Sequence, residues 1–192
     1  MQTEQSGMVE KVRDAVVAAI EVTGDIVQAT VNTIAETLAT TIDGTGKVGM
    51  SVTEAIADVV SGAIRGAVQV GANLGHAAKG TMVGVLRGTK AAGTEVLDTI
   101  RHTAHVTIRD AAEVGGDLDA AATGLIEGAI EGAKELGVRV EDAASAAADG
   151  ALEAAGEVGS TAVETVRRAV TRSSHDAKVV LKQLRMAVSK NK

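Results

Sequence analysis

Five residue types are missing from this sequence: it contains no Phe, Tyr, Trp, Pro or Cys. The absence of Cys excludes disulfides, thiolate metal sites and cysteine nucleophiles. The absence of Pro means that no ring clash interrupts a helix. Without aromatic side chains, the core lacks its usual large anchors, and bases of a nucleic acid find no ring to stack on. We therefore expect a core of small aliphatic side chains and no nucleic-acid partner.

The residues that are present indicate an ordered chain with an uneven charge. Of 192 residues, 45% are hydrophobic and 22 are Gly, so the composition is not that of a disordered protein. The net charge is −6, but residues 167–192 carry eight basic residues and one acidic residue, whereas residues 1–166 carry 11 basic and 24 acidic residues. No long stretch is both apolar and free of charge, and residues 1–7 lack a signal pattern. We expect a cytoplasmic protein, with peripheral attachment to a membrane or granule as the alternative.

One repeat runs through nearly the whole chain. Cut every 22 residues from Val9, the sequence forms eight rows that align without insertion or deletion up to Leu184. Apolar columns recur at spacings of three and four, which is a helical face, and 22 residues are two units of eleven, or three helical turns each. The repeat predicts an all-α protein of long amphipathic helices. The twelfth column marks the apolar stripe: Ile20, Ile42, Ile64, Leu86, Ile108, Ile130 and Leu152.

Glycines occupy two sets of fixed positions. The first set lies at four-residue spacing beside the apolar stripe, where small residues let two helix backbones approach closely. It predicts helix-packing contacts at Gly62, Gly66, Gly84, Gly88, Gly128 and Gly132. The second set fills the nineteenth column and predicts hinges at Gly49, Gly71, Gly93, Gly115, Gly137 and Gly159.

The repeat alone is compatible with a continuous helix or with shorter helices that fold back as hairpins or join a bundle or filament. A continuous helix over the eight rows has a length of about 260 Å. Capping signals favour interruptions: Ser51 precedes Glu54 by three residues, and Gly115-Gly116-Asp117 combines a helix end with a helix start. We divide the chain into a polar segment (1–8), a repeat region (9–162) with a basic Gly-rich part (61–93) and an acidic part (117–157), and a basic C-terminal helix (163–192).

Tandem helices of 11 and 22 residues resemble those of exchangeable apolipoproteins, perilipin-type droplet coats and synucleins. The segments 66–71 and 132–137 are similar in style to synuclein repeats. The chain also resembles phasins in its length and in its Ala-rich, Cys-free composition. The resemblance is one of period and residue type, and it implies helices that coat a lipid or granule surface. The departures are the missing Pro, the missing aromatic residues and the acidic rows.

No motif indicates a chemical reaction. His102 and His105 lie three residues apart, with Asp98 four residues before His102, but a further ligand cluster is lacking, so we expect no metal. Ser and Thr are common, yet no His or acidic residue is placed as in a catalytic triad. We expect neither an enzyme nor a bound cofactor.

The favoured function is structural. An amphipathic helix this rich in Gly is weak in water unless its stripe is buried, which predicts self-assembly into a bundle, filament or sheath. The alternative is a peripheral coat on a membrane, droplet or storage granule. The basic residues expected to meet an anionic lipid, or the acidic face of a neighbouring copy, are Arg167, Arg168, Arg172, Lys178, Lys182 and Arg185. The basic and acidic parts are expected to pair antiparallel around Gly115-Gly116, or between chains.

Overall fold

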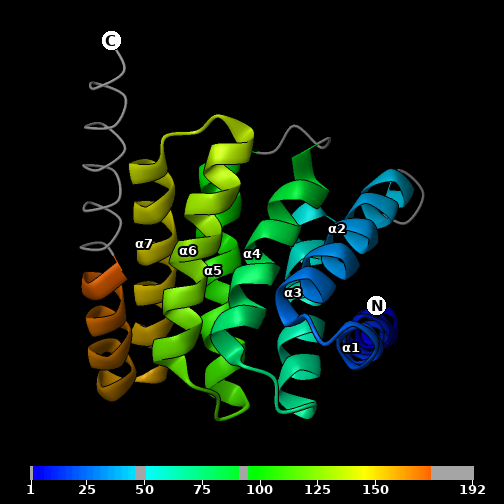
Figure 1. Cartoon of the computed structure of the whole chain (residues 1–192), viewed down its shortest axis with the longest axis horizontal. Helices are drawn as coiled ribbons and strands as arrows, with labels where there is room; N and C mark the ends of the chain where they lie inside the picture. Colours follow the sequence, from blue (N-terminus) through cyan, green and yellow to red (C-terminus); the bar gives the residue numbers. More distant parts are fainter. Residues whose placement is uncertain (1, 46–50, 91–94, 174–192) are drawn as a thin grey trace.

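The computed structural model describes residues 2–45, 51–90 and 95–173, and the elements in these ranges are helices joined by short turns. The labelled helices are α1 (Gln2–Thr23), α2 (Ile26–Thr45), α3 (Val52–Gln69), α4 (Leu74–Thr89), α5 (Val96–Glu113), α6 (Leu118–Leu136) and α7 (Val140–Val158). A further helix covers residues 160–173. The prediction of an all-α protein is confirmed, and Figure 1 shows the helices arranged as one array.

Each 22-residue row forms one helix. The helices α3, α4, α5, α6 and α7 begin at Val52, Leu74, Val96, Leu118 and Val140, which are spaced by one repeat each. The residue before each start lies in an extended conformation, as expected of a helix N-cap. The chain therefore folds back once per repeat, and the alternative of one continuous helix is wrong.

Local capping explains where these helices start. Ser51 and Glu54 form the capping box that their spacing predicts, because the Ser51 hydroxyl accepts from the Glu54 N–H and the Glu54 carboxylate accepts from the Ser51 N–H. The side chain of Asp117 accepts from the backbone N–H groups of Asp119 and Ala120. These bonds satisfy N–H groups that have no partner inside the helix.

Glycines of the nineteenth column end several helices. Gly71, Gly115 and Gly137 have φ angles of 65°, 67° and 72°, a left-handed region that other residues rarely adopt, and Gly159 has a φ of 141°. The predicted hinges Gly49 and Gly93 lie outside the described residues. The first row has Val27 in this column, and its turn is formed three residues earlier by Gly24, with a φ of 68°.

Substituting Gly137 tests the role of these turns. Because Gly137 ends α6 in the left-handed conformation, we expect Gly137→Ala to lower the free energy of unfolding by about 1–2 kcal/mol. Gly137→Asn should cost less, since Asn tolerates this conformation better than Ala. Urea unfolding followed by circular dichroism measures both values. Equal stability of the wild type and the Ala variant would contradict the assignment.

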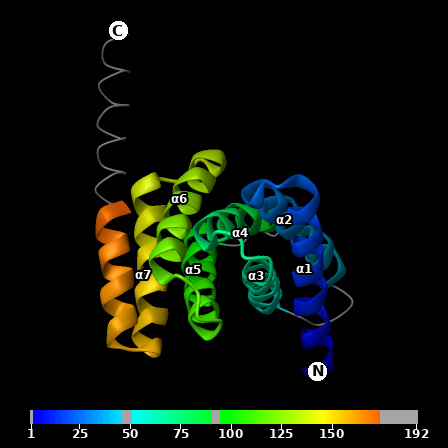
Figure 2. The ribbon, with the colours of Figure 1, turned by 60° about the horizontal axis from the view of Figure 1, so that its bottom comes forward.

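Helices two apart in the sequence pack side by side and form two layers. The helices α2, α4 and α6 form one layer, and α1, α3, α5 and α7 form the other. The contact between α3 and α5 is the least extensive of those between labelled helices two apart. Figure 2 shows α3 nearly end-on while α5 and α7 stand nearly upright, so the direction of the helices changes along the array.

The core lies between the two layers and consists of aliphatic side chains. Its largest fully buried members are Ile34, Leu38, Ile64, Met82, Ile100, Ile108, Leu125 and Ile126, together with Val12, Val16, Val59 and Val60. Buried Ala residues fill the helix interfaces around them, most densely on α7. The core thus reaches close packing without aromatic side chains, because small residues let the helix backbones approach each other.

Candidate functional site

The contacts between repeats are the most specific feature of the described chain. In the layer of α2, α4 and α6, glycines of one helix meet the backbone of the helix two before it. A methyl group at Gly84 would lie 2.9 Å from Ile34 Cβ and 3.0 Å from the Val31 carbonyl oxygen. A methyl group at Gly128 would lie 2.7 Å from the Lys79 carbonyl oxygen. Such spacing leaves no room for a side chain, so these glycines set the distance between helices.

The remaining predicted packing glycines lie in equivalent contacts. Gly88 faces Leu38 and Ala35 on α2, whereas Gly132 faces only the side chain of Leu86 on α4. In the other layer, Gly62 and Gly66 of α3 face α1: Gly62 meets Val9 and Val12, and Gly66 meets Arg13 and Val16. Three further glycines have the same role: Gly80 against Val27 and Thr30, Gly124 against the Gly75 backbone, and Gly150 against the Arg101 backbone.

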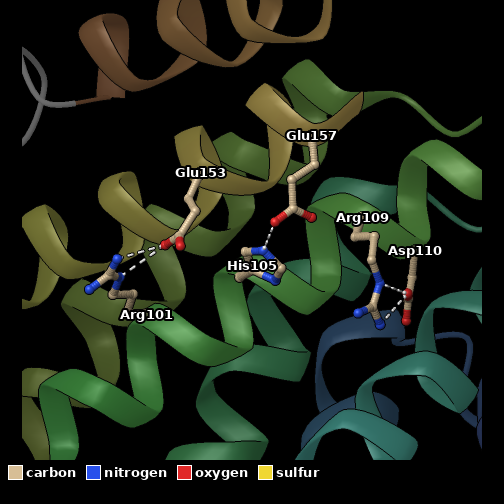
Figure 3. A network of polar contacts seen from close by, with 6 residues as sticks. All are labelled: Arg101, His105, Arg109, Asp110, Glu153 and Glu157. Atoms are coloured by element: carbon tan, nitrogen blue, oxygen red, sulfur yellow. Dashed lines mark hydrogen bonds and ion pairs between the residues drawn. The ribbon is translucent and has the colours of Figure 1, made fainter. Parts of the chain in front are cut away.

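The contact between α3 and α5 is built differently. The α5 helix contains no Gly, and its side of the contact is partly polar. Asp110 is only 2% exposed, and it accepts a hydrogen bond from the Ser61 hydroxyl of α3 as well as bonds from the Arg109 guanidinium. Figure 3 shows Arg109 beside this carboxylate. The carboxylate is thus paired with a charge and a hydroxyl, as burial of a charge requires.

The apolar stripe faces the interior of the array. Ile64, Leu86 and Ile108 are buried in the core. Ile20, Ile42, Ile130 and Leu152 are half-buried and pack against it. The stripe of one chain is therefore covered mainly by other helices of the same chain.

Ion pairs link helices two apart along the rims of these contacts. The basic residue lies on the earlier helix and the acidic residue lies 48 or 52 positions later: Arg65–Glu113, Lys79–Glu131, Arg87–Glu135 and Arg101–Glu153. The hydrogen-bond contact of His105 with Glu157 has the same spacing of 52. Arg101–Glu153 and His105–Glu157 appear in Figure 3. Hydrogen bonds from Arg87 hold the pKa of Glu135 below its ordinary value, and Arg101 acts likewise on the pKa of Glu153. Because these pairs are exposed and screened by solvent, they select the register more than they stabilise the fold.

The pairing of basic and acidic parts differs from the expectation. Lys79 and Arg87 of the basic part do meet Glu131 and Glu135 of the acidic part. However, the residue numbers of the two pairs increase together, so α4 and α6 run parallel and not antiparallel around Gly115-Gly116. The reason is that α5 intervenes in the sequence: each turn reverses the chain, and two reversals restore the direction.

The basic residues of the C-terminal part are only partly described. Arg172 binds Asp119 of α6 with a distance of 2.7 Å between Nη2 and Oδ2, and it also donates to the Thr123 hydroxyl. Arg167 and Arg168 are exposed, and no ion pair joins them to a residue of the described ranges. Lys178, Lys182 and Arg185 lie outside those ranges.

The histidines of α5 take separate roles. His105 Nε2 lies 3.1 Å from Glu157 Oε1. The ring of His102 is half-buried, its Nε2 has no hydrogen-bond partner, and burial lowers its pKa although a hydrogen bond with the Thr53 backbone opposes the shift. The described part of the chain holds no group of three or more His, Cys, Asp or Glu residues arranged to bind a metal ion.

His102 makes stability depend on pH. A pKa below the ordinary value of 6.5 means that the folded state disfavours the charged ring, so stability is lost as the pH falls below about 6.5. We expect His102→Gln to remove part of the loss between about pH 7 and pH 5.5. Thermal unfolding as a function of pH measures this effect, and His76→Gln, at an exposed position of α4, serves as the matched control. An unchanged profile in the His102 variant would contradict the prediction.

Sequence reasoning did not find the partners of these contacts. In the ion pairs along the rims, the partner of each basic residue lies on the helix two positions later in the sequence. The pattern that indicates this pairing is the recurrence of opposite charges at spacings of 48 and 52 residues. Gly75 and Gly24 were also missed because they fall outside the predicted glycine columns.

None of the described helices has the length and hydropathy needed to cross a bilayer.

Comparisons with known proteins identify the fold. No protein-family model matches the chain, and no curated protein matches its sequence. Its structure is similar to the crystal structure of the de novo designed helical repeat protein DHR7, with a TM-score of 0.59 and 20% sequence identity. The similarity covers 93% of this chain and 97% of the designed one. The chain therefore has a helical repeat fold, and the resemblance to repeat proteins holds at the level of this class.

Proposed function

We propose that this chain is a non-enzymatic structural protein that assembles with further copies of itself in the cytoplasm. The proposal rests on one observation: in the part of the chain that the structure describes, the array of helices has an end that no neighbouring helix covers. The helices α3, α4 and α5 each pack on the helix two before and the helix two after them, whereas α1 and α2 have such a neighbour on one side only. In repeat proteins each repeat packs on its neighbours through the same kind of contact. The uncovered sides of α1 and α2 correspond to the sides that bind a neighbouring helix inside the array, and this favours the packing of a further copy there.

A second candidate is a peripheral coat on an anionic membrane, droplet or granule. It is favoured by Arg167 and Arg168, which are exposed on the last described helix. The buried apolar stripe argues against it, because Ile64, Leu86 and Ile108 reach a lipid surface only if the two layers separate. The structural proposal needs no such opening.

Sedimentation velocity over a wide range of concentrations tests the structural proposal. We expect the sedimentation coefficient to rise with concentration while the helix content measured by circular dichroism stays constant. A single species of monomer mass at every concentration would refute self-assembly. The same dichroism measurement with phosphatidylserine vesicles tests the coat: helix that forms only when vesicles are added would favour the coat.

A further inference from the structure

The N-terminal end of the array presents an acidic surface. Val12 and Val16 of α1 face α3, and Asp14 lies two residues from each of them. Ile34 and Leu38 of α2 face α4, and Glu36 again lies midway between them. Residues two apart point to opposite sides of a helix, so Asp14 and Glu36 point away from the array. Both are exposed.

The neighbouring charges strengthen this acidic character. In the range 7–42 the chain has five acidic residues and two basic ones, a net charge of −3, and four of the acids are exposed beside Asp14: Glu10, Glu21, Asp25 and Glu36. Arg13 is occupied by an ion pair with Asp14, with 2.8 Å between Nη2 and Oδ1. We call these five exposed acids, Asp14 included, the acidic end.

The opposite end of the array presents arginines. The helix 160–173 stands at the other extreme of the array in Figures 1 and 2. Its buried side consists of Ala162, Val166, Ala169 and Ser173. Arg167 precedes Ala169 by two residues and Arg168 follows Val166 by two, so both point away from this buried side. This exposed pair is called the arginine end.

We propose that the acidic end of one copy docks on the arginine end of another, head to tail. The inference rests on the proposed function and specifies its contact. The contacts of α3 with α5, α4 with α6 and α5 with α7 already carry ion pairs on their rims, and the last described helix uses the same device: Arg172 binds Asp119 of α6 within the chain, one turn from Arg168. Two different surfaces then meet, and such a contact propagates into linear assemblies.

Four acidic residues of the middle repeats are poorer partners for these arginines. Glu131, Glu135, Glu153 and Glu157 are paired with basic residues of the same chain. Asp14 has a partner one residue away in Arg13, but no ion pair joins Glu36 to another described residue. A second copy of this chain therefore offers these arginines a complementary surface at the opposite end of its array, formed by Asp14 and Glu36.

Charge reversal and mixing test the contact. The first variant carries Asp14→Lys and Glu36→Lys, and the second carries Arg167→Glu and Arg168→Glu. We expect each variant alone to associate at least about tenfold more weakly than the wild type, because like charges then face each other. An equimolar mixture should assemble again, since each reversed end meets an end of opposite charge. Sedimentation velocity measures association, and circular dichroism confirms that each variant is folded.

A matched control reverses two acids of the middle of the array. Glu95→Lys with Glu141→Lys changes the net charge as much as the first variant does, at exposed positions of other repeats. This control should associate like the wild type. Weakening by the control, or a mixture of the two end variants that stays monomeric, would overturn the inference.

The remaining outcomes separate this inference from the proposed function. A wild-type chain that is monomeric at all concentrations refutes both. Wild-type assembly that neither end variant weakens refutes the head-to-tail contact alone. If the arginine variant assembles normally but no longer sediments with phosphatidylserine vesicles, the arginines serve a lipid surface and the inference is wrong.

Discussion

Replacing Gly150 by leucine is expected to prevent stable packing of α7 on α5. A side chain at Gly150 meets the backbone carbonyl of Arg101, which belongs to a helix and has no free space to move into. Overpacking of this kind costs about 3 kcal/mol or more, a large share of the stability of a small domain. Urea unfolding followed by circular dichroism measures the loss.

The same helix provides the control. Gly156 of α7 is exposed and a side chain there meets nothing within 4 Å. Because Gly weakens a helix, Gly156→Ala should raise the free energy of unfolding by about 0.5–1 kcal/mol. Opposite signs for two glycines six residues apart would show that packing and not composition decides their role. A Gly150 variant as stable as the wild type would contradict the close contact.

Truncation of the apolar stripe should also have a large effect. Ile108 has 0% exposure in the core. We therefore expect Ile108→Ala to lower the free energy of unfolding by about 2–4 kcal/mol, through lost burial and the cavity left behind. The experiment is carried out in buffer, at a concentration where sedimentation shows a monomer.

A half-buried stripe position serves as the comparison. Ile130 packs against the core but is partly exposed, so Ile130→Ala should cost clearly less than Ile108→Ala. If the stripe were covered by lipid or by other copies, both substitutions would leave the stability of the monomer unchanged. Equal, negligible effects would thus contradict burial of the stripe within one chain.

Much of the fold follows from the period of the sequence. The glycines at 71, 115 and 137 lie in one column, and the structure uses each of them as a turn with positive φ. Only Gly adopts this conformation without strain, which is why a glycine column points to turns. The first row holds Val27 in this column, and its turn lies at Gly24.

The partners of the helices were not predictable in the same way. A period shows that Ile64 and Ile108 lie on an apolar face, but it does not show which surface covers that face. The stripe is compatible with cover by folded-back helices of the same chain, by other copies or by lipid, and the structure covers it with helices of the same chain. The contact between Ser61 and Asp110 was also invisible, because neither residue follows the repeat as a motif.

Small-angle X-ray scattering, extrapolated to infinite dilution, tests the central claim that each repeat folds back on its neighbours within one chain. A compact chain of this length has a radius of gyration of about 16 Å, and an elongated array of packed helices has a somewhat larger value. A continuous helix of about 260 Å has a radius of gyration of about 75 Å. We predict a value in the lower range together with full helicity in buffer; a value near that of the continuous helix would contradict the account.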